Sequence, residues 1–235
     1  MICRRLRRKI NVAPQISVSS VWVVPQRYHA GRDDGLILAH GAGNDMTNPF
    51  LSFVHEAVCR DGTLSVKFNF PYKERGGKAP DPAARLEQTL EAVVARVRGD
   101  ESLSPRRLFL GGKSMGGHMA SHLAAAGTDV AGLVFLGYPL HPPKQFERLR
   151  AEHLSRIQCP MLFIQGTRDP LCRLDLLQNV AKKLQASVTV HVIDDGDHSF
   201  KVPKRGGRTE ANVWEEIGAV VTAWLRAGDV VSNRD

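Results

Sequence analysis

Apolar and polar positions follow one another along this chain in blocks that predict a regular succession of strands and helices from about residue 16 onward. Short, almost continuously apolar runs are typical of parallel strands covered on both faces, and they lie at residues 17–24, 36–40, 64–68, 108–111, 132–137, 161–165 and 188–193. The intervening segments predict helices at residues 50–59, 83–97, 115–126, 146–154, 174–184 and 213–225. This order favours an α/β fold, with a mostly parallel, doubly wound sheet and helices on both faces.

The spacing between two of these strands limits what can cover the loops at their carboxyl ends. About twenty residues separate the strand that ends near Tyr138 from the one that begins at Met161, which is room for one helix. A large inserted cap would need a longer segment, so we expect little or no lid domain. In a doubly wound sheet the site is built from loops at the carboxyl ends of the strands, and here that site should be open.

Length, composition and cysteine spacing predict the number of domains and the compartment. A chain of 235 residues with 43% hydrophobic side chains predicts one globular domain, here over residues 16–227, with tails at 1–15 and 228–235. No apolar run approaches the roughly 18 residues that a membrane-spanning helix needs. The four cysteines are widely spaced and form no C-x-x-C pair. This spacing argues against a zinc site or a disulfide framework and favours a reducing, cytoplasmic compartment.

The net charge of +8 is concentrated near the N-terminus. Residues 4–9 hold five basic side chains, which leaves +3 for the rest of the chain. We expect residues 1–15 to form a disordered basic tail or a segment added by an upstream start codon. Contact with nucleic acid or anionic lipid, and a transit-peptide role, stay open as alternatives. Because the domain itself carries little excess charge, no specific nucleic-acid partner is expected.

The most informative segment joins the predicted strand at 108–111 to the helix after it. Gly112-Lys-Ser-Met-Gly116 fits G-x-S-x-G, the nucleophile-elbow pattern, which holds a serine on a strained turn between a strand and a helix. The glycines remove side chains that would collide in so tight a turn. Ser114 is therefore the candidate nucleophile. The helix N-terminus and the Met115 N–H would face a developing oxyanion.

The same segment contains Gly-Lys-Ser, which is also the end of a phosphate-binding P-loop. That motif requires a glycine five residues before Gly112, and this chain has Arg107 there. Apolar strand residues also occupy the positions of the flexible loop. The P-loop interpretation therefore fails.

An elbow serine needs a base, and the base needs an orienting carboxylate. Asp169 follows the predicted strand at 161–165, and His198 follows the one at 188–193, so the order is serine, acid, histidine, as in hydrolases with this elbow. Both loops lie at the same sheet edge as Ser114, which predicts a Ser114–His198–Asp169 triad. Rival acids lie in the loop of the histidine itself, where they would have difficulty reaching its far nitrogen: Asp194, Asp195 and Asp197. His118 and His122 are interpreted as structural residues of the helix after the elbow.

A second oxyanion donor is expected from a glycine-rich loop after an early strand. His40-Gly-Ala-Gly43 follows the apolar run at 36–40, and its small residues would let backbone N–H groups approach a substrate oxygen. We favour the N–H of Ala42 as the partner of the Met115 N–H, with Gly43 as the neighbouring option.

Six segments together resemble the α/β-hydrolases, and within them the small dienelactone-hydrolase-like subgroup that includes the testis-expressed 30 and NSL-complex subunit 3-like proteins. The resemblance covers roughly residues 17–226 and rests on Ala39-His-Gly-Ala-Gly, Phe68-Asn-Phe-Pro-Tyr, Gly111-Gly-Lys-Ser-Met-Gly-Gly, Gly137-Tyr-Pro-Leu-His-Pro-Pro, Gln165-Gly-Thr-Arg-Asp-Pro and Gly196-Asp-His-Ser-Phe. It implies a serine hydrolase that needs no metal and no organic cofactor and acts on a small-molecule ester or thioester. Some relatives are subunits of complexes, so a catalytically silent scaffold is the alternative function.

Aromatic and apolar residues on loops at the same edge are candidates for an acyl pocket, namely Met46, Phe70, Tyr72, Tyr138 and Leu140. Lys113 and Arg168 would give the mouth of the site a positive character, or else they are solvated surface charges. The sequence leaves the acyl and alcohol specificity open.

Overall fold

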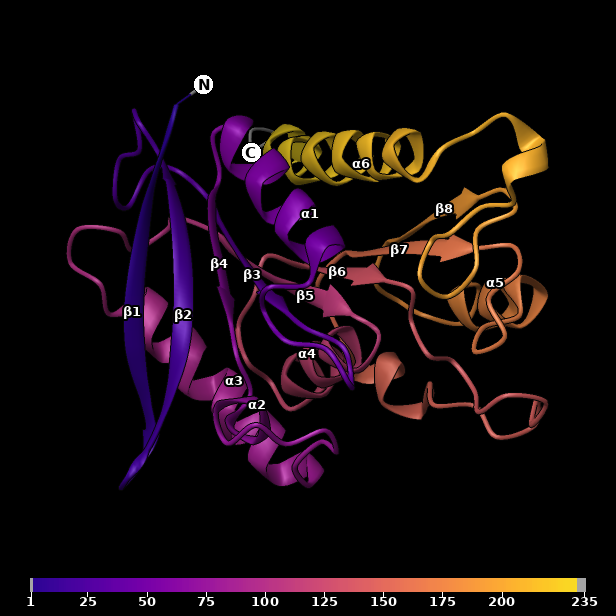
Figure 1. Ribbon diagram of the computed structural model, residues 1–235, viewed down its shortest axis with the longest axis horizontal. Coiled ribbons are helices and arrows are strands. Elements are labelled where there is room, and N and C mark those ends of the chain that lie inside the picture. Colours follow the sequence, from indigo (N-terminus) through magenta and orange to yellow (C-terminus); the bar gives the residue numbers. More distant parts are fainter. Residues whose placement is uncertain (1, 232–235) are drawn as a thin grey trace.

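The computed structural model describes residues 2–231, and its centre is one eight-stranded sheet with the order β1-β2-β4-β3-β5-β6-β7-β8 (Figure 1). The strands are β1 (Cys3–Ala13), β2 (Ile16–Pro25), β3 (Gly35–Ala39), β4 (Leu64–Phe68), β5 (Leu108–Lys113), β6 (Gly132–Leu136), β7 (Met161–Gly166) and β8 (Val188–Ile193). β2 pairs antiparallel with both β1 and β4, and all other neighbours are parallel. The mostly parallel sheet predicted from the apolar runs is confirmed.

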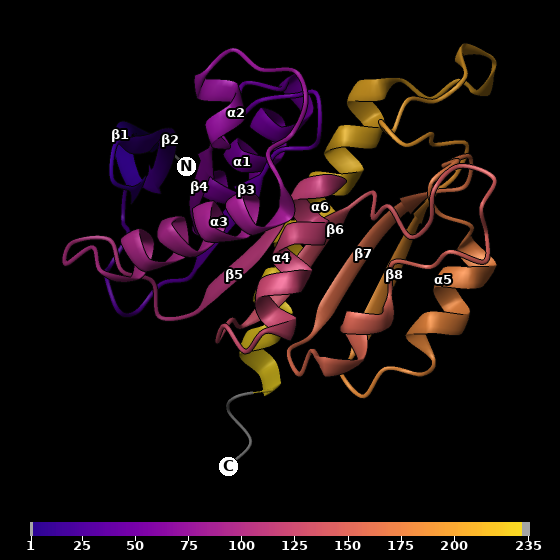
Figure 2. The ribbon, with the colours of Figure 1, turned by 90° about the horizontal axis from the view of Figure 1, so that it is seen from below.

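Helices cover both faces of the sheet. They are α1 (Pro49–Arg60), α2 (Pro71–Glu74), α3 (Ala83–Arg98), α4 (Met115–Ala125), α5 (Leu174–Ala181) and α6 (Glu210–Val231), with 3-10 turns η1 (Glu152–Arg156) and η2 (Lys204–Gly206). α1 and α6 pack together over one face, and α3, α4 and α5 cover the other (Figures 1 and 2). Because β3 and β6 are buried along their whole length, their sequences are apolar on both faces. β4 is also buried but contains the polar residues Ser65 and Lys67.

The predicted strands agree with the observed ones to within two residues, but one predicted helix is wrong. Residues 146–154 are irregular and then enter η1, because Phe146 and Leu149 are each 40% exposed and offer no apolar face for a helix to bury. The Arg150 N–H donates to the Leu140 carbonyl at 2.7 Å, which closes this segment into a loop. The short helix α2 lies where no helix was expected. No large lid lies between β6 and β7.

The prediction of a disordered tail at residues 1–15 is wrong for the described part, residues 2–15, because β1 forms a hairpin with β2 whose register shifts once, between Asn11 and Ala13. Charged side chains of β1 find acidic partners on the domain, which include the pairs Lys9–Glu74 at 3.0 Å, Arg8–Asp100 and Arg5–Glu56. The Arg8 guanidinium also lies 4.6 Å from the centre of the Trp22 ring. A strand whose exposed positions are basic resembles a charged tail in the sequence.

The cysteine interpretation also needs correction. Cys3 of β1 and Cys59 of α1 form a disulfide across 56 positions of sequence, while Cys159 and Cys172 are free. The pairing of these two cysteines removes the sequence argument for a reducing compartment.

The C-terminal boundary of the domain differs from the predicted one at residue 227. α6 continues to Val231, so no tail begins at residue 228, and the rest of that predicted tail (232–235) lies outside the described residues. Among residues 2–231 there is no helix whose length and hydropathy would let it cross a membrane.

Candidate active site

The turn between β5 and α4 has the geometry that the elbow pattern predicts. Ser114 has φ 50° and ψ −114°, a conformation that costs free energy for a residue with a side chain. A Cβ atom placed on Gly112 or on Gly116 would lie 2.3 Å from the carbonyl oxygen of Ala39. The two glycines are therefore required by the neighbouring strand β3, which packs directly under the turn.

The structure brings the three predicted catalytic side chains into one hydrogen-bonded chain. His198 Nε2 lies 2.9 Å from Ser114 Oγ, and His198 Nδ1 lies 2.7 Å from Asp169 Oδ2. The Asp169 carboxylate is fully buried and also accepts hydrogen bonds from the Gln165 amide and the Leu171 N–H. Because the carboxylate accepts from Nδ1–H, Nε2 keeps a lone pair that can accept the serine proton.

Two loops meet closely to hold this arrangement. A Cβ atom on Gly166, at the end of β7, would lie 2.1 Å from the Gly196 carbonyl oxygen in the loop after β8. The loops that carry Asp169 and His198 are thus in backbone contact, and this contact requires a glycine at position 166.

The rival acids of the histidine loop have other positions. Asp197 Oδ1 accepts the N–H groups of Ser199 and Lys201 at 2.7 and 2.9 Å, so this carboxylate braces the loop. Asp194 and Asp195 are exposed. Of these acids and Asp169, only Asp169 bonds to His198 in the described part of the chain.

The loop expected to complete the oxyanion hole lies against the elbow. A Cβ atom on Gly41 would lie 3.2 Å from the Lys113 carbonyl oxygen and 3.5 Å from Ser114 Cβ. Ala42 and Gly43 follow and are exposed, and the Met115 N–H is the first of α4, so it has no acceptor within the helix. Their role as oxyanion donors stays a prediction.

His40, which the sequence interpretation used only as part of a motif, fixes this loop. It is fully buried, its Nδ1 donates to the Gly41 carbonyl at 2.9 Å, and its Nε2 accepts the Phe70 N–H at 3.1 Å. Burial lowers the pKa of His40 to about 4, so the ring is neutral at neutral pH. A neutral ring can donate at one nitrogen and accept at the other, as both contacts require.

The charged end of Lys113 is not exposed to solvent, either on the protein surface or at the entrance of the active site. Its Nζ is buried and has no hydrogen-bond partner among the described residues, and it lies 5.4 Å from the centre of the Phe200 ring. A Cβ atom on Gly137 would lie 2.9 Å from this Nζ and 3.6 Å from His198 Nδ1, so the lysine and the histidine border the same glycine. Burial lowers the pKa of Lys113 to about 8, while the Asp169 and Asp197 charges act in the opposite direction. Arg168 is exposed.

Most of the residues proposed for an acyl pocket lie in the core. Phe70, Tyr138 and Leu140 have no exposed surface and Tyr72 is 2% exposed. The Tyr138 hydroxyl donates to the Arg150 carbonyl at 2.8 Å, which accounts for its polar end. Met46 is the one of the five that is not buried, so the packing does not favour the other four as an open pocket.

Comparisons with known proteins identify the family and support the fold. Residues 32–226 match the family model described as an alpha/beta hydrolase domain. Among solved structures, a dienelactone hydrolase from Anabaena variabilis is 17% identical, with 96% of this chain and 98% of that chain covered and a TM-score of 0.75.

Two further structures are similar in fold. An esterase from Pyrococcus furiosus has a TM-score of 0.74 at 18% identity, with 96% of this chain and 93% of that chain covered. A serine hydrolase without a lid from Xanthomonas campestris has a TM-score of 0.71 at 21% identity, with 94% of each chain covered. At these identities the likeness concerns the fold, whereas the family match spans most of the chain. The chain therefore belongs to the α/β-hydrolase family.

Proposed function

We propose that this hydrolase transfers the acyl group of a small ester or thioester to water through a covalent intermediate on Ser114. The observation that carries the proposal is the unbroken hydrogen-bond chain from Ser114 Oγ through both nitrogens of His198 to the buried carboxylate of Asp169. A hydroxyl, an imidazole and a buried carboxylate in this order activate the hydroxyl as a nucleophile.

The reaction proceeds in two acyl transfers. Ser114 Oγ attacks the substrate carbonyl carbon while His198 Nε2 takes the hydroxyl proton, and the C–O or C–S bond then breaks as the imidazolium returns that proton to the leaving alcohol or thiol. In the second half, His198 takes a proton from water, hydroxide oxygen bonds to the acyl carbon, and the acid leaves as Ser114 regains its proton. Asp169 keeps Nδ1 protonated throughout and stabilises the imidazolium.

The developing oxyanion is assigned to the backbone N–H groups of Met115 and Ala42, with Gly43 as the alternative to Ala42. Met115 supports this role because its N–H begins α4, where the helix dipole favours negative charge. Each donor of this kind contributes roughly 10²–10³ in rate. Every step uses protein groups and water, so we propose that the reaction needs no metal or organic cofactor.

Two observations support a small ester-type substrate. Neighbours in fold include a protein named as a dienelactone hydrolase and another named as an esterase. Loops without a large lid leave the edge of the sheet near Ser114 open, and Met46 keeps exposed surface on one of these loops. The six sequence motifs further support a place in the dienelactone-hydrolase-like subgroup with the testis-expressed 30 and NSL-complex subunit 3-like proteins.

Labelling with a fluorophosphonate probe tests the proposal. The full chain should be labelled, and the label should disappear in Ser114→Ala and fall strongly in His198→Ala, whereas Ser199→Ala should be labelled normally. Ser199 is the matched control because it is exposed and adjacent to His198. Hydrolysis of p-nitrophenyl acetate and of acetyl thiocholine then separates esterase from thioesterase activity. A folded wild-type chain that takes no label and hydrolyses neither compound would overturn the proposal and favour the scaffold function.

A further inference from the structure

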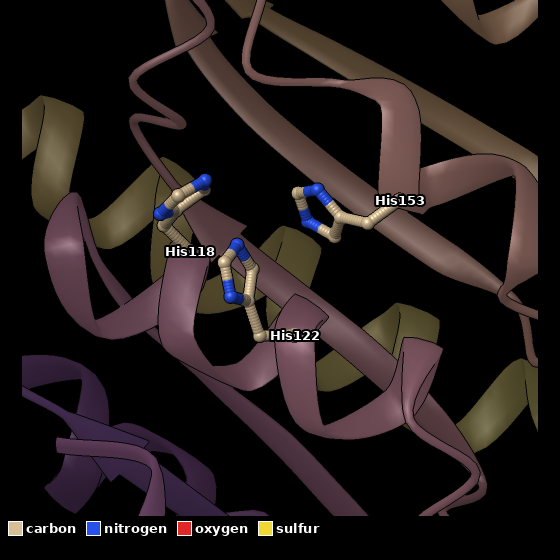
Figure 3. A group of neighbouring side chains, drawn as sticks. All are labelled: His118, His122 and His153. Carbon is tan, nitrogen blue, oxygen red and sulfur yellow. The ribbon is translucent and has the colours of Figure 1, made fainter. Parts of the chain in front are cut away.

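Three histidines come together on the side of α4, away from the hydrogen-bonded chain of Ser114. His118 and His122 are one helical turn apart on α4, and His153 faces them from η1 (Figure 3). One ring nitrogen from each lies within 4.8 Å of the other two. The ring centres are 4.3 to 5.3 Å apart. Side chains at i and i+4 of a helix lie on one face, which is a common arrangement for two histidine ligands of a metal.

Hydrogen bonds fix which nitrogen of His153 carries its proton. Ser121 Oγ donates to the His118 carbonyl at 2.7 Å, and the Tyr138 hydroxyl donates to the Arg150 carbonyl at 2.8 Å. Both hydroxyls face His153 Nε2, at 2.7 and 3.4 Å. Because their own protons are already used, they accept from Nε2–H. The Nδ1 atom of His153 is therefore left with a free lone pair.

The other two rings also have a nitrogen available. His122 Nδ1 lies 2.7 Å from Glu87 Oε1, and a carboxylate accepts at that distance, so Nε2 carries the lone pair. The ring of His118 makes no hydrogen bond in the described part of the chain. A carboxylate behind a histidine ligand is the usual outer partner that orients the ring and makes it more basic toward a metal.

The three histidine side chains are partly buried, and their rings contact one another. Neutral imidazole is the form that coordinates zinc.

An open cavity of about 510 Å³ gives access to the cluster and surrounds its entrance with negative charge. Its lining includes three carboxylates and one guanidinium beside two of the histidines: Glu87, Glu91, Glu152, Arg156, His122 and His153. The excess of carboxylates attracts a hydrated cation, and the open side leaves room for a water molecule as a fourth ligand.

We propose that His118, His122 and His153 bind a divalent transition metal ion of the zinc class, with a fourth position open to this cavity. At metal–nitrogen distances of about 2.0–2.1 Å, tetrahedral ligands are about 3.3 Å apart. Small rotations of the three side chains would bring the nitrogens from their present separation to this distance. The ion would join η1 to α4, and the His118 N–H donates to the Ser114 carbonyl at 3.0 Å, so the metal would also brace the turn that carries the nucleophile.

Titration of the full-length chain with Co²⁺ and Zn²⁺, after removal of any histidine tag, tests this site. We expect one ion per chain, a visible d–d absorption band with Co²⁺ that Zn²⁺ abolishes, and a rise in the midpoint of thermal unfolding of roughly 5 °C at a hundredfold excess of Zn²⁺ over its Kd. His122→Ala should weaken binding at least 100-fold and abolish the thermal shift.

The matched control is His191→Ala. The side chains of His122 and His191 are 32% and 31% exposed, and each contacts a glutamate at 2.7 Å. This control should bind Co²⁺ like the wild type. His122→Asn, which keeps a polar side chain, serves if circular dichroism shows that His122→Ala does not fold. Absence of stoichiometric Co²⁺ binding by the wild type, or equal binding by a folded His122 variant, would overturn the proposal.

Discussion

His198 and His118 both lie near the first turns of α4, yet their neighbours differ in kind. Both nitrogens of His198 are hydrogen-bonded, one to a buried carboxylate and the other to a hydroxyl. His118 faces two other imidazoles and the Tyr138 ring, and among residues 2–231 no carboxylate or hydroxyl is hydrogen-bonded to its ring. The first environment directs a proton along one line, whereas the second brings ring nitrogens of three histidines within 4.8 Å of one another. The same side chain is thus suited to proton transfer or to metal binding according to what surrounds it.

The largest effect is expected from Asp169→Asn. An amide at this position would present its NH₂ group to His198 Nδ1 or to the Gln165 amide, so the histidine would take the wrong tautomer. We expect kcat for an ester substrate to fall about 10⁴-fold. Steady-state kinetics measure the loss, and Asp197→Asn provides a comparison because the hydrogen bonds of its carboxylate, among the described residues, lie within its own loop. If kcat of Asp169→Asn stays within tenfold of the wild-type value, the buried carboxylate is not what distinguishes His198 from His118.

A large loss of stability is expected from Gly116→Ala, in the first turn of α4. The added methyl group would lie 2.3 Å from the Ala39 carbonyl oxygen, and backbone atoms of a packed sheet cannot move aside. The free energy of unfolding should fall by about 3 kcal/mol or more. Urea denaturation measures it. Gly206→Ala should change it by less than about 1 kcal/mol, because no atom lies within 4 Å of the new methyl group.

Lys113→Met should stabilise the protein at pH 7. Burial lowers the pKa of Lys113 to about 8 from an ordinary value near 10.5, so the unfolded chain binds this proton more tightly than the folded one. The wild type therefore gains stability from this group as the pH rises from about 8 to 10.5. The variant should exceed the wild type by about 1–3 kcal/mol at pH 7 and lose this advantage near pH 10. Urea denaturation at the two pH values measures the difference, and an advantage that does not change with pH would contradict the assignment.

A smaller effect is expected from Glu87→Gln at the three-histidine cluster. The amide would still contact His122 but without the negative charge, so the affinity for Zn²⁺ should fall about tenfold. Isothermal titration measures it, with Glu216→Gln beside His191 as the control. Equal weakening in both variants would mean that general surface charge, and not the bond to His122, sets the affinity.

The sequence predicted the parallel strands and the residues at their carboxyl ends because both are encoded locally. Asp169 and His198 each follow an apolar run directly, and parallel strands bring such positions to one edge. His153 could not be found in this way, because it lies in a 3-10 turn within an irregular segment and meets His118 only through tertiary packing. The sequence interpretation assigned His118 and His122 a structural role because nothing in the sequence indicates that His153 lies beside them.

The N-terminal strand was missed for a different reason. Its backbone pairs regularly with β2, but of its side chains only Ile10 is buried, and basic residues dominate the rest. The apolar pattern that identifies a strand is therefore almost absent from this segment. The partner carboxylates lie on segments far along the chain, so no local pattern in residues 3–13 indicates them.

β1 is an edge strand of the sheet, and its arginines therefore lie where another chain could pair with it. A terminal strand presents unpaired backbone N–H and carbonyl groups along its outer side, and another chain can add to them as a ninth strand. A second copy that approached with its own β1 would bring Arg4 and Arg7 against the same residues of the first, since Arg5, Arg8 and Lys9 are paired with carboxylates of their own domain. Like charges at such close range repel, so these two arginines disfavour edge-to-edge aggregation between copies while the domain stays folded.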